Sequence, residues 1–178
     1  INYLDSRTQE DVETLSEKNL EIWGRETGNP QPNCMFPAMF ARWMMKNCEE
    51  YQQKGKKFVH NAPYILAHLA GLKAEDAFID WGAMSGWGLG YHVLEKRWSK
   101  EQLDLLGIPK EMMPKIRKPW DIIGHLTEEF AQKTGLPAGI PICAEAGDTM
   151  QSMIGCGVTR VNKAADVAGT CAMFCIAT

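Results

Sequence analysis

The clearest pattern of apolar and polar positions lies in the C-terminal part of the chain, from Pro137 to Thr178. Short apolar runs predict three strands there: Ile140 to Ala144, Ala164 to Ala168 and Ala172 to Ile176. Between the first two, Gly147 and Asp148 interrupt the run and residues 149–154 predict a short helix. The last two strands form a hairpin with Gly169-Thr170 at its tip. This order is typical of α/β folds, in which loops at strand ends bind ligands.

Upstream, polar stretches crossed by apolar stripes predict helices. The segment from Gln9 to Arg25 predicts one or two surface helices. Residues 34–47 are apolar on nearly every face, which predicts a buried helix; a peptide-binding groove is the alternative use of its methionines. Residues 58–63 predict a strand that leads into a helix, and Gly71 ends that helix.

The segment from Trp98 to Leu136 predicts two more helices, one after the N-cap Ser99 and one beginning at Thr127. Residues 122–126 predict a strand that turns at Gly124. Together with the C-terminal pattern, these elements predict an α/β fold.

Length and composition describe an ordinary globular domain. The chain has 178 residues, enough for one domain with a core, and is 45% hydrophobic and 23% charged. The net charge of −3 does not indicate the positively charged surface that nucleic-acid-binding proteins present. No apolar run approaches the roughly 18 residues needed to span a membrane, and no signal-peptide pattern opens the chain.

The cysteines and histidines do not form metal-binding patterns. None of the six cysteines lies in a C-x-x-C pair, and the four histidines lack H-E-x-x-H or similar spacing. The cysteines therefore indicate reduced, buried thiols of a cytoplasmic protein rather than a disulfide framework or a zinc site.

Asp148 and the Gly169-Thr170 turn each allow two interpretations. Asp148 either caps the helix that follows it, or presents a carboxylate where unpaired backbone N–H groups also suit a phosphate. Gly169-Thr170 is either an ordinary hairpin turn or a phosphate-binding loop. Their occurrence together, 170 − 148 = 22 residues apart, favours the functional interpretation.

These motifs resemble those of the FGGY carbohydrate kinases, which include xylulokinase and glycerol kinase. In that family an apolar strand leads to Gly-Asp and a short helix ending in G-x-G, and a hairpin with Gly-Thr at its turn follows. The resemblance makes Asp148 the catalytic base and Thr149 a substrate contact. It places Gly169, Thr170 and Cys171 in a phosphate loop that approaches the nucleotide.

Weaker matches extend the resemblance over nearly the whole chain. Thr134-Gly135-Leu136 matches the family's T-G-L before the catalytic strand, and Asp5 and Arg7 match a D-x-R element that shapes the wall of the sugar cleft. The alternative for Asp5 and Arg7 is a local ion pair that closes a turn. Trp81 and Trp87 are candidates for stacking on a sugar, with structural roles favoured for both.

The resemblance implies ATP-dependent phosphorylation of a sugar or polyol, with Mg²⁺ and possible homodimerisation, and a xylulose-like ketose as the first substrate to expect. It implies an actin-like (ribonuclease H-like) fold, with residues 1–178 as part of the first domain. The first phosphate loop and the nucleotide-binding second domain would lie outside this chain, which alone would be inactive.

Two residues depart from the family pattern. Glu145 replaces a glycine that many members have near the Gly-Asp, and its carboxylate would repel that of Asp148 if both face the cleft, whereas strand alternation would point it away. Cys171 stands where Ser or Gly is common. These departures keep a non-catalytic sugar-binding or assembly module as the alternative function. Another actin-like ATPase, such as a chaperone, fits the motifs less well.

Overall fold

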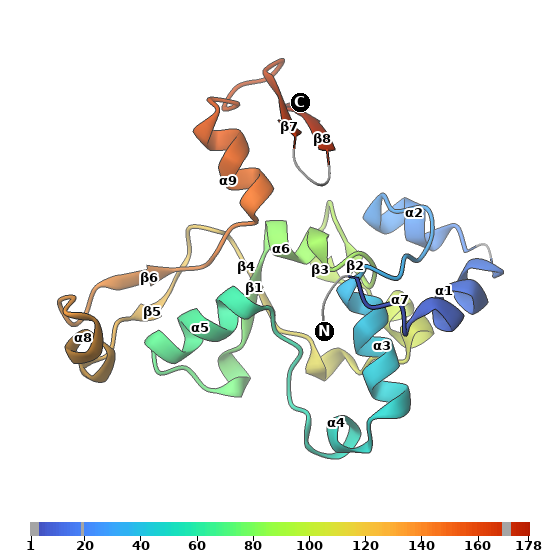
Figure 1. The fold of residues 1–178 in the computed structure, drawn as a ribbon, viewed down its shortest axis with the longest axis horizontal. Coiled ribbons are helices and arrows are strands. Elements are labelled where there is room, and N and C mark those ends of the chain that lie inside the picture. The colour runs from blue at the N-terminus through green and yellow to red at the C-terminus, as the bar shows by residue number, and fades with distance from the viewer. Residues whose placement is uncertain (1–3, 19, 169–171) are drawn as a thin grey trace. The chain divides into compact units, whose positions relative to one another are not determined.

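The computed structural model describes residues 4–18, 20–168 and 172–178, which form two compact units (Figure 1). Unit 1 is Ile1–Glu145 and unit 2 is Ala146–Thr178. Both contain helices and strands, so the predicted α/β class is confirmed.

Short helices make up much of unit 1. In chain order they are α1 (Gln9–Ser16), α2 (Ile22–Thr27), α3 (Pro37–Asn47), α4 (Glu49–Lys54), α5 (Asn61–Leu69), α6 (Trp81–Gly86), α7 (Lys100–Leu106) and α8 (Glu128–Thr134), with 3-10 turns η1 (Ala74–Asp76) and η2 (Lys110–Met112). The predicted N-caps are confirmed, because the Ser99 and Thr127 hydroxyls accept hydrogen bonds from the N–H groups of Gln102 and Phe130. Left-handed Gly107 and Gly135 end the same two helices.

The strands of unit 1 pair two by two. β1 (Phe78–Asp80) runs parallel to β4 (Lys115–Arg117), and β2 (Tyr91–His92) pairs antiparallel with β3 (Arg97–Trp98). β5 (Ile122–His125) pairs antiparallel with β6 (Pro141–Cys143), with an irregularity between Ile122 and Gly124. Gly124 is required there, because a Cβ would lie 2.8 Å from the Cβ of Ala70.

The main core of unit 1 gathers side chains from α1, α2, α3, α6 and α7 and from β1 to β3. Figure 1 shows α3 beside α1 and α7, in agreement with their contacts. Ala38 to Ala41 of α3 are buried, whereas Trp43 and Met44 are half-buried and Met35 precedes the helix, so the predicted buried helix is buried on one side only. A smaller core under α8 contains Leu126, Ala131 and Ile142.

Two polar groups buried in unit 1 have hydrogen-bond partners from other elements. The Gln102 amide donates to Glu26 Oε2 (2.9 Å) and Tyr91 O (3.1 Å) and accepts from Gly90 N (2.7 Å). The Asp11 carboxylate accepts from Arg42 Nε (2.9 Å) and Lys46 Nζ (2.7 Å). Such pairing offsets the cost of desolvating these groups and fixes how α1, α2, α3 and α7 meet.

One predicted element of unit 1 is wrong. Residues 58–60 form no strand, and the segment is irregular up to the start of α5 at Asn61. The Phe58 N–H bonds to Met112 O (2.9 Å), but Val59 is exposed and no ladder continues from that bond. The helix that follows is confirmed, and Gly71, with a φ of 67°, lies just beyond its end.

Unit 2 consists of α9 (Asp148–Gly155) and the antiparallel hairpin β7 (Ala164–Ala168) and β8 (Ala172–Ile176). All three were predicted, with ends that agree within a residue. Among the described residues of this unit only Met153 is buried. In the part of the chain that the structure describes, no helix is both long and apolar enough to cross a membrane.

Candidate active site

The candidate base Asp148 is the first residue of α9 and its side chain is exposed. β6 and the four residues 144–147 lead to it, and Gly147 occupies the N-cap position. The position is the N-terminus of an eight-residue helix, where free N–H groups and the helix dipole favour a negative charge.

Hydrogen bonds to the next residue hold the Asp148 carboxylate. Its Oδ1 accepts from the Thr149 N–H at 2.7 Å, and Thr149 Oγ1 lies 3.4 Å from the same oxygen. Asp148 follows the N-cap residue Gly147, and its bond to the Thr149 N–H satisfies one of the free amides at the start of α9, as the capping interpretation expects. Oδ2 has no hydrogen bond within the described residues, so one oxygen is oriented and the other is available.

Gly169, Thr170 and Cys171, the predicted phosphate loop, lie outside the described residues. The flanking strands are described, and β7 pairs with β8 in register from Ala164↔Ile176 to Ala168↔Ala172. β7 and β8 therefore form the antiparallel strand pair that the sequence predicted.

Asp5 and Arg7 form the local ion pair that was one of their two interpretations. Arg7 Nη2 lies 2.7 Å from Asp5 Oδ2, and the Arg7 backbone N–H donates to Asp5 Oδ1 at 3.0 Å. The hydrogen bonds from Arg7 lower the pKa of Asp5. The Arg7 guanidinium also lies 4.7 Å from the centre of the Trp43 ring, so it is held between a carboxylate and an aromatic face.

A second group of titratable side chains lies within unit 1. Asp80 is fully buried at the end of β1, where its carboxylate caps α6 by accepting from Gly82 N (2.6 Å) and Ala83 N (3.2 Å). Burial, followed by repulsion from Asp80, raises the pKa of Glu145 to about 7. Burial lowers the pKa of His60, against an opposing attraction from Asp80.

Two atoms of this group have no hydrogen-bond partner in the described structure. They are Glu145 Oε1 and His60 Nε2, both buried. The Glu145 carboxylate therefore lies near enough to that of Asp80, within unit 1, for the two to repel each other. The influence of Asp80 on both Glu145 and His60 was missed, because the three residues are distant in sequence and carry no shared motif.

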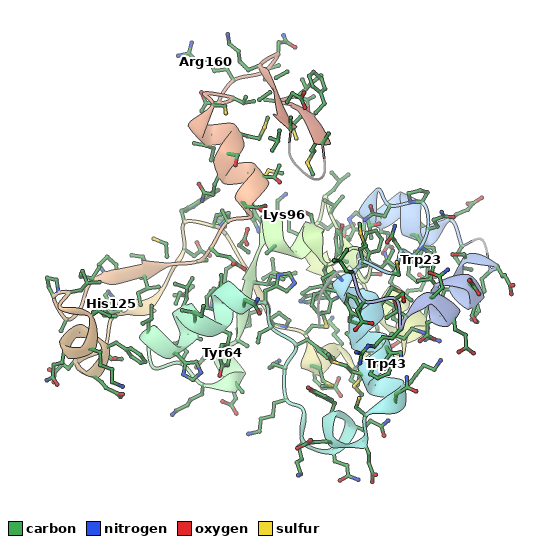
Figure 2. All side chains as sticks on the ribbon, in the orientation of Figure 1. Trp23, Trp43, Tyr64, Lys96, His125 and Arg160 are labelled. Atoms are coloured by element: carbon green, nitrogen blue, oxygen red, sulfur yellow. The ribbon has the colours of Figure 1, made fainter. Side chains whose placement is uncertain are left out.

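The tryptophans separate by burial. Trp87 is 3% exposed and stacks on His60 with ring centres 5.6 Å apart, so the structural role favoured for it is confirmed. Trp81 is half-buried and packs edge to face with Trp120, with ring centres 5.4 Å apart. The Lys96 Nζ lies 4.8 Å from the centre of the Trp81 ring. Lys96 is labelled in Figure 2. Trp120 was not predicted to take part in such a contact.

No group of three or more His, Cys, Asp or Glu side chains in the described residues is arranged to hold a metal ion. The described cysteines are all free thiols, but their predicted burial is wrong: Cys143 and Cys156 are exposed, and the others are half-buried because they lie at the edges of elements or between them rather than in the core.

Comparison with known proteins decides the family. The model of the "FGGY family of carbohydrate kinases, N-terminal domain" matches residues 1–155. The chain belongs to the FGGY family of carbohydrate kinases. The match includes the strand–Gly-Asp–helix segment around Asp148 and ends before the β7–β8 hairpin.

Relatives and solved structures agree with this family. A glycerol kinase of Thermococcus onnurineus is 25% identical over 153 residues, covering 84% of this chain and 29% of its own length. The crystal structure of a ligand-bound xylulose kinase from Lactobacillus acidophilus is 25% identical with a TM-score of 0.83, covering 98% of this chain and 34% of that one. A Plasmodium falciparum glycerol kinase with ADP, 22% identical, shares the fold with a TM-score of 0.85 over 98% of this chain and 34% of its own.

The likeness to these kinases confirms the predicted actin-like fold. The FGGY chain spans about a third or less of the length of each of these relatives.

Proposed function

We propose that the protein containing this chain transfers the γ-phosphoryl group of ATP to a hydroxyl of a sugar or polyol. The observation that carries the proposal is the exposed, oriented carboxylate of Asp148 at the N-terminus of α9, in a chain of the FGGY family. The Thr149 N–H fixes Oδ1, which leaves Oδ2 to accept the proton of the attacking hydroxyl.

In this mechanism the sugar oxygen attacks the γ-phosphorus as its proton passes to Asp148. The bond between the γ-phosphorus and the β,γ-bridging oxygen breaks and ADP leaves. Gly169, Thr170 and Cys171 would form the loop along the phosphates, and Thr149, Asp5 and Arg7 would contact or shape the sugar site. Positioning and charge stabilisation supply most of the rate enhancement in such transfers.

Magnesium would fit this site bound mainly by the nucleotide's phosphates, and not by a set of protein ligands that encloses it. The described residues contain no three-ligand cluster, and Mg²⁺ usually keeps several waters and binds through substrate phosphates with one or two carboxylates. Bound in that way, it neutralises phosphate charge during transfer.

The complete enzyme would need parts that this chain does not contain. We propose that residues 1–178 belong to the first domain, and that the first phosphate loop and the nucleotide-binding second domain lie elsewhere in the protein. The fraction of each relative that the chain spans supports this assignment. The isolated chain should then show no ATP turnover, and we expect the complete protein to be cytoplasmic and able to form a homodimer.

The first experiment is ATP consumption by the full-length protein with ketoses, aldoses, polyols and sugar acids. We expect turnover with one class, and xylulose-like ketoses come first because a xylulose kinase is among the solved structures at 25% identity. If no compound supports ATP consumption but sugar binding is still measurable by calorimetry, the result would favour a non-catalytic sugar-binding module. Glu145 and Cys171, the departures from the family pattern, are the features that favour that alternative.

The second experiment replaces the base. Asp148→Asn should lower kcat by about 10² to 10⁴ because it removes a positioned proton acceptor, while sugar affinity stays within about tenfold. Asp166→Asn is the matched control, since Asp166 is an exposed carboxylate on β7 of the same unit. Full turnover by Asp148→Asn would overturn the assignment of the base.

A further inference from the structure

A cavity of about 750 Å³ lies in unit 1, among residues that the proposed chemistry does not use. Its walls come from the end of α4, the segment up to α5, one side of α5, residues 71–78 and the first turn of α8. Tyr64, labelled on α5 in Figure 2, is one of the lining residues. The volume lies within the range of small-molecule sites in proteins.

The inner surface of this cavity is apolar. Pro63 and Phe78 are buried beneath it, and Ala67, Leu72 and Phe130 are half-buried around it. These side chains can pack against an aliphatic or aromatic group. They give a neutral sugar few of the hydrogen-bond partners that its hydroxyl groups need.

The rim of the cavity is basic. Lys54, Lys56, Lys57 and Lys73 all line it. Lys57 is held in place, because its Nζ donates to Glu111 O (2.6 Å) and Met113 O (3.1 Å). Within residues 4–18, 20–168 and 172–178, neither Lys56 nor Lys73 makes an ion pair or a side-chain hydrogen bond.

Among the four lysines, Lys54 pairs with Glu50 on α4 (3.7 Å), and no carboxylate that lines the cavity is left to neutralise Lys56, Lys57 or Lys73. Glu129 is the acid among the lining residues, and its Oε1 lies 2.5 Å from Lys133 Nζ, which lowers the pKa of Glu129. The net charge of the chain is −3, so this local excess of positive charge runs against the balance of the whole sequence. Concentrated charge above an apolar floor attracts an anion whose body is apolar.

We propose that this cavity binds an organic anion with an apolar body, its acidic head group near Lys56 and Lys73 and its body against Leu72 and Phe78. The head group is a carboxylate, sulfonate or phosphate, which share the charge that the lysines recognise. The site is independent of the proposed kinase reaction, since none of its residues belongs to the candidate active site.

The test uses naphthalene-2-carboxylate and its uncharged analogue 2-naphthamide, titrated into the full-length protein by calorimetry. The carboxylate should bind about tenfold or more tightly than the amide, and high salt should weaken only the carboxylate, because lysine attraction is screened. Equal affinities for the two compounds, or no binding of the carboxylate at millimolar concentration, would overturn the proposal.

Two variants locate the binding. Lys56→Glu/Lys73→Glu should weaken carboxylate binding about tenfold or more, whereas Lys18→Glu/Lys110→Glu, which changes the same charge at exposed lysines outside the cavity, should change it less than about twofold. Ala67→Phe places bulk inside the cavity and should weaken both compounds without a change of net charge. If the two double variants weaken binding equally, the carboxylate responds to overall charge and the cavity is not its site.

Discussion

Unit 1 and unit 2 differ in how they bury apolar side chains. Unit 1 has a continuous core in which Trp23, Met39 and Leu103 are at most 1% exposed. The described part of unit 2 buries only Met153, and leaves Ile154 60% and Phe174 68% exposed. The residues that stabilise the fold and the residue proposed for catalysis therefore belong to different units of the same chain.

This difference separates two kinds of mutational effect. Truncating a residue of unit 1 removes packed neighbours and leaves a cavity, whereas truncating an exposed residue of unit 2 removes few contacts. Function-bearing segments are commonly drawn from the less stable parts of a protein. All six tryptophans of this chain lie in unit 1, so among its two units tryptophan fluorescence during urea unfolding reports on unit 1.

The largest expected effect comes from a matched pair of helix residues. Leu103→Ala in α7 should lower the free energy of unfolding by about 2–5 kcal/mol, because Leu103 is fully buried. Ile154→Ala in α9 should change it by less than about 0.5 kcal/mol. The measurement is urea unfolding followed by tryptophan fluorescence and by circular dichroism, which also detects α9.

Equal losses for the two variants would contradict the comparison. They would show that Ile154 is buried in the full-length protein and that unit 2 shares a core with other parts of it.

The next effect compares two aspartates. Asp11→Asn should cost about 2–3 kcal/mol, because it leaves the largely buried Arg42 and the half-exposed Lys46 without their carboxylate. Asp166→Asn on the exposed face of β7 should be near neutral. Urea midpoints of both variants measure this difference, and an unchanged midpoint for Asp11→Asn would show that solvent compensates the two cations.

Elements whose start and end are determined by the residues next to them in the chain could be predicted from the sequence. Thr127 and Gly135 bracket α8, and the Asp5-Arg7 pair closes its turn through contacts two residues apart. The strand at residues 58–60 was wrong because strand formation needs a partner ladder, which no local pattern guarantees.

The candidate site shows the same limit. Asp148 at the start of α9 follows from a local Gly-Asp before a helix. The proximity of Glu145, Asp80 and His60 depends on how β1, β6 and the segment before α5 pack, and the sequence contains no pattern for that packing.

The third prediction uses pH within unit 1. The pKa of Glu145 is raised to about 7 from an ordinary value of 4.5, so the folded state holds this proton more tightly than the unfolded state. The stability associated with Glu145 is therefore full below about pH 4.5 and is lost as the pH rises toward about 7. Glu145→Gln should raise the free energy of unfolding by about 1–2 kcal/mol at about pH 8, allowing for partial solvation, and change it little at about pH 4.

The control for this variant is Glu75→Gln, an exposed carboxylate of η1 in the same unit. Because the His60 pKa is lowered, His60 works in the opposite direction: its stability is present above about pH 6.5 and is lost as the pH falls. Urea unfolding across this pH range in His60→Gln and Glu145→Gln should separate the two slopes. A Glu145→Gln effect that does not change with pH would rule out burial of its charge as the cause.

The smallest expected effect concerns the two helix starts. Ser99 accepts a capping bond from the Gln102 N–H at 3.4 Å, and Ser99→Ala should cost about 1 kcal/mol. The bond that Asp148 accepts from the Thr149 N–H can also be accepted by an asparagine oxygen, so Asp148→Asn should cost less than about 0.5 kcal/mol even though it removes the proposed base. Thermal unfolding by circular dichroism of both variants, beside their kcat values, gives the comparison.

A stability loss for Asp148→Asn equal to that for Ser99→Ala would mean that the carboxylate supports α9, and a lower kcat would then reflect folding as well as proton transfer. A stable Asp148→Asn protein with a large loss of kcat assigns that loss to chemistry, because the oriented carboxylate contributes to the reaction without contributing to the fold.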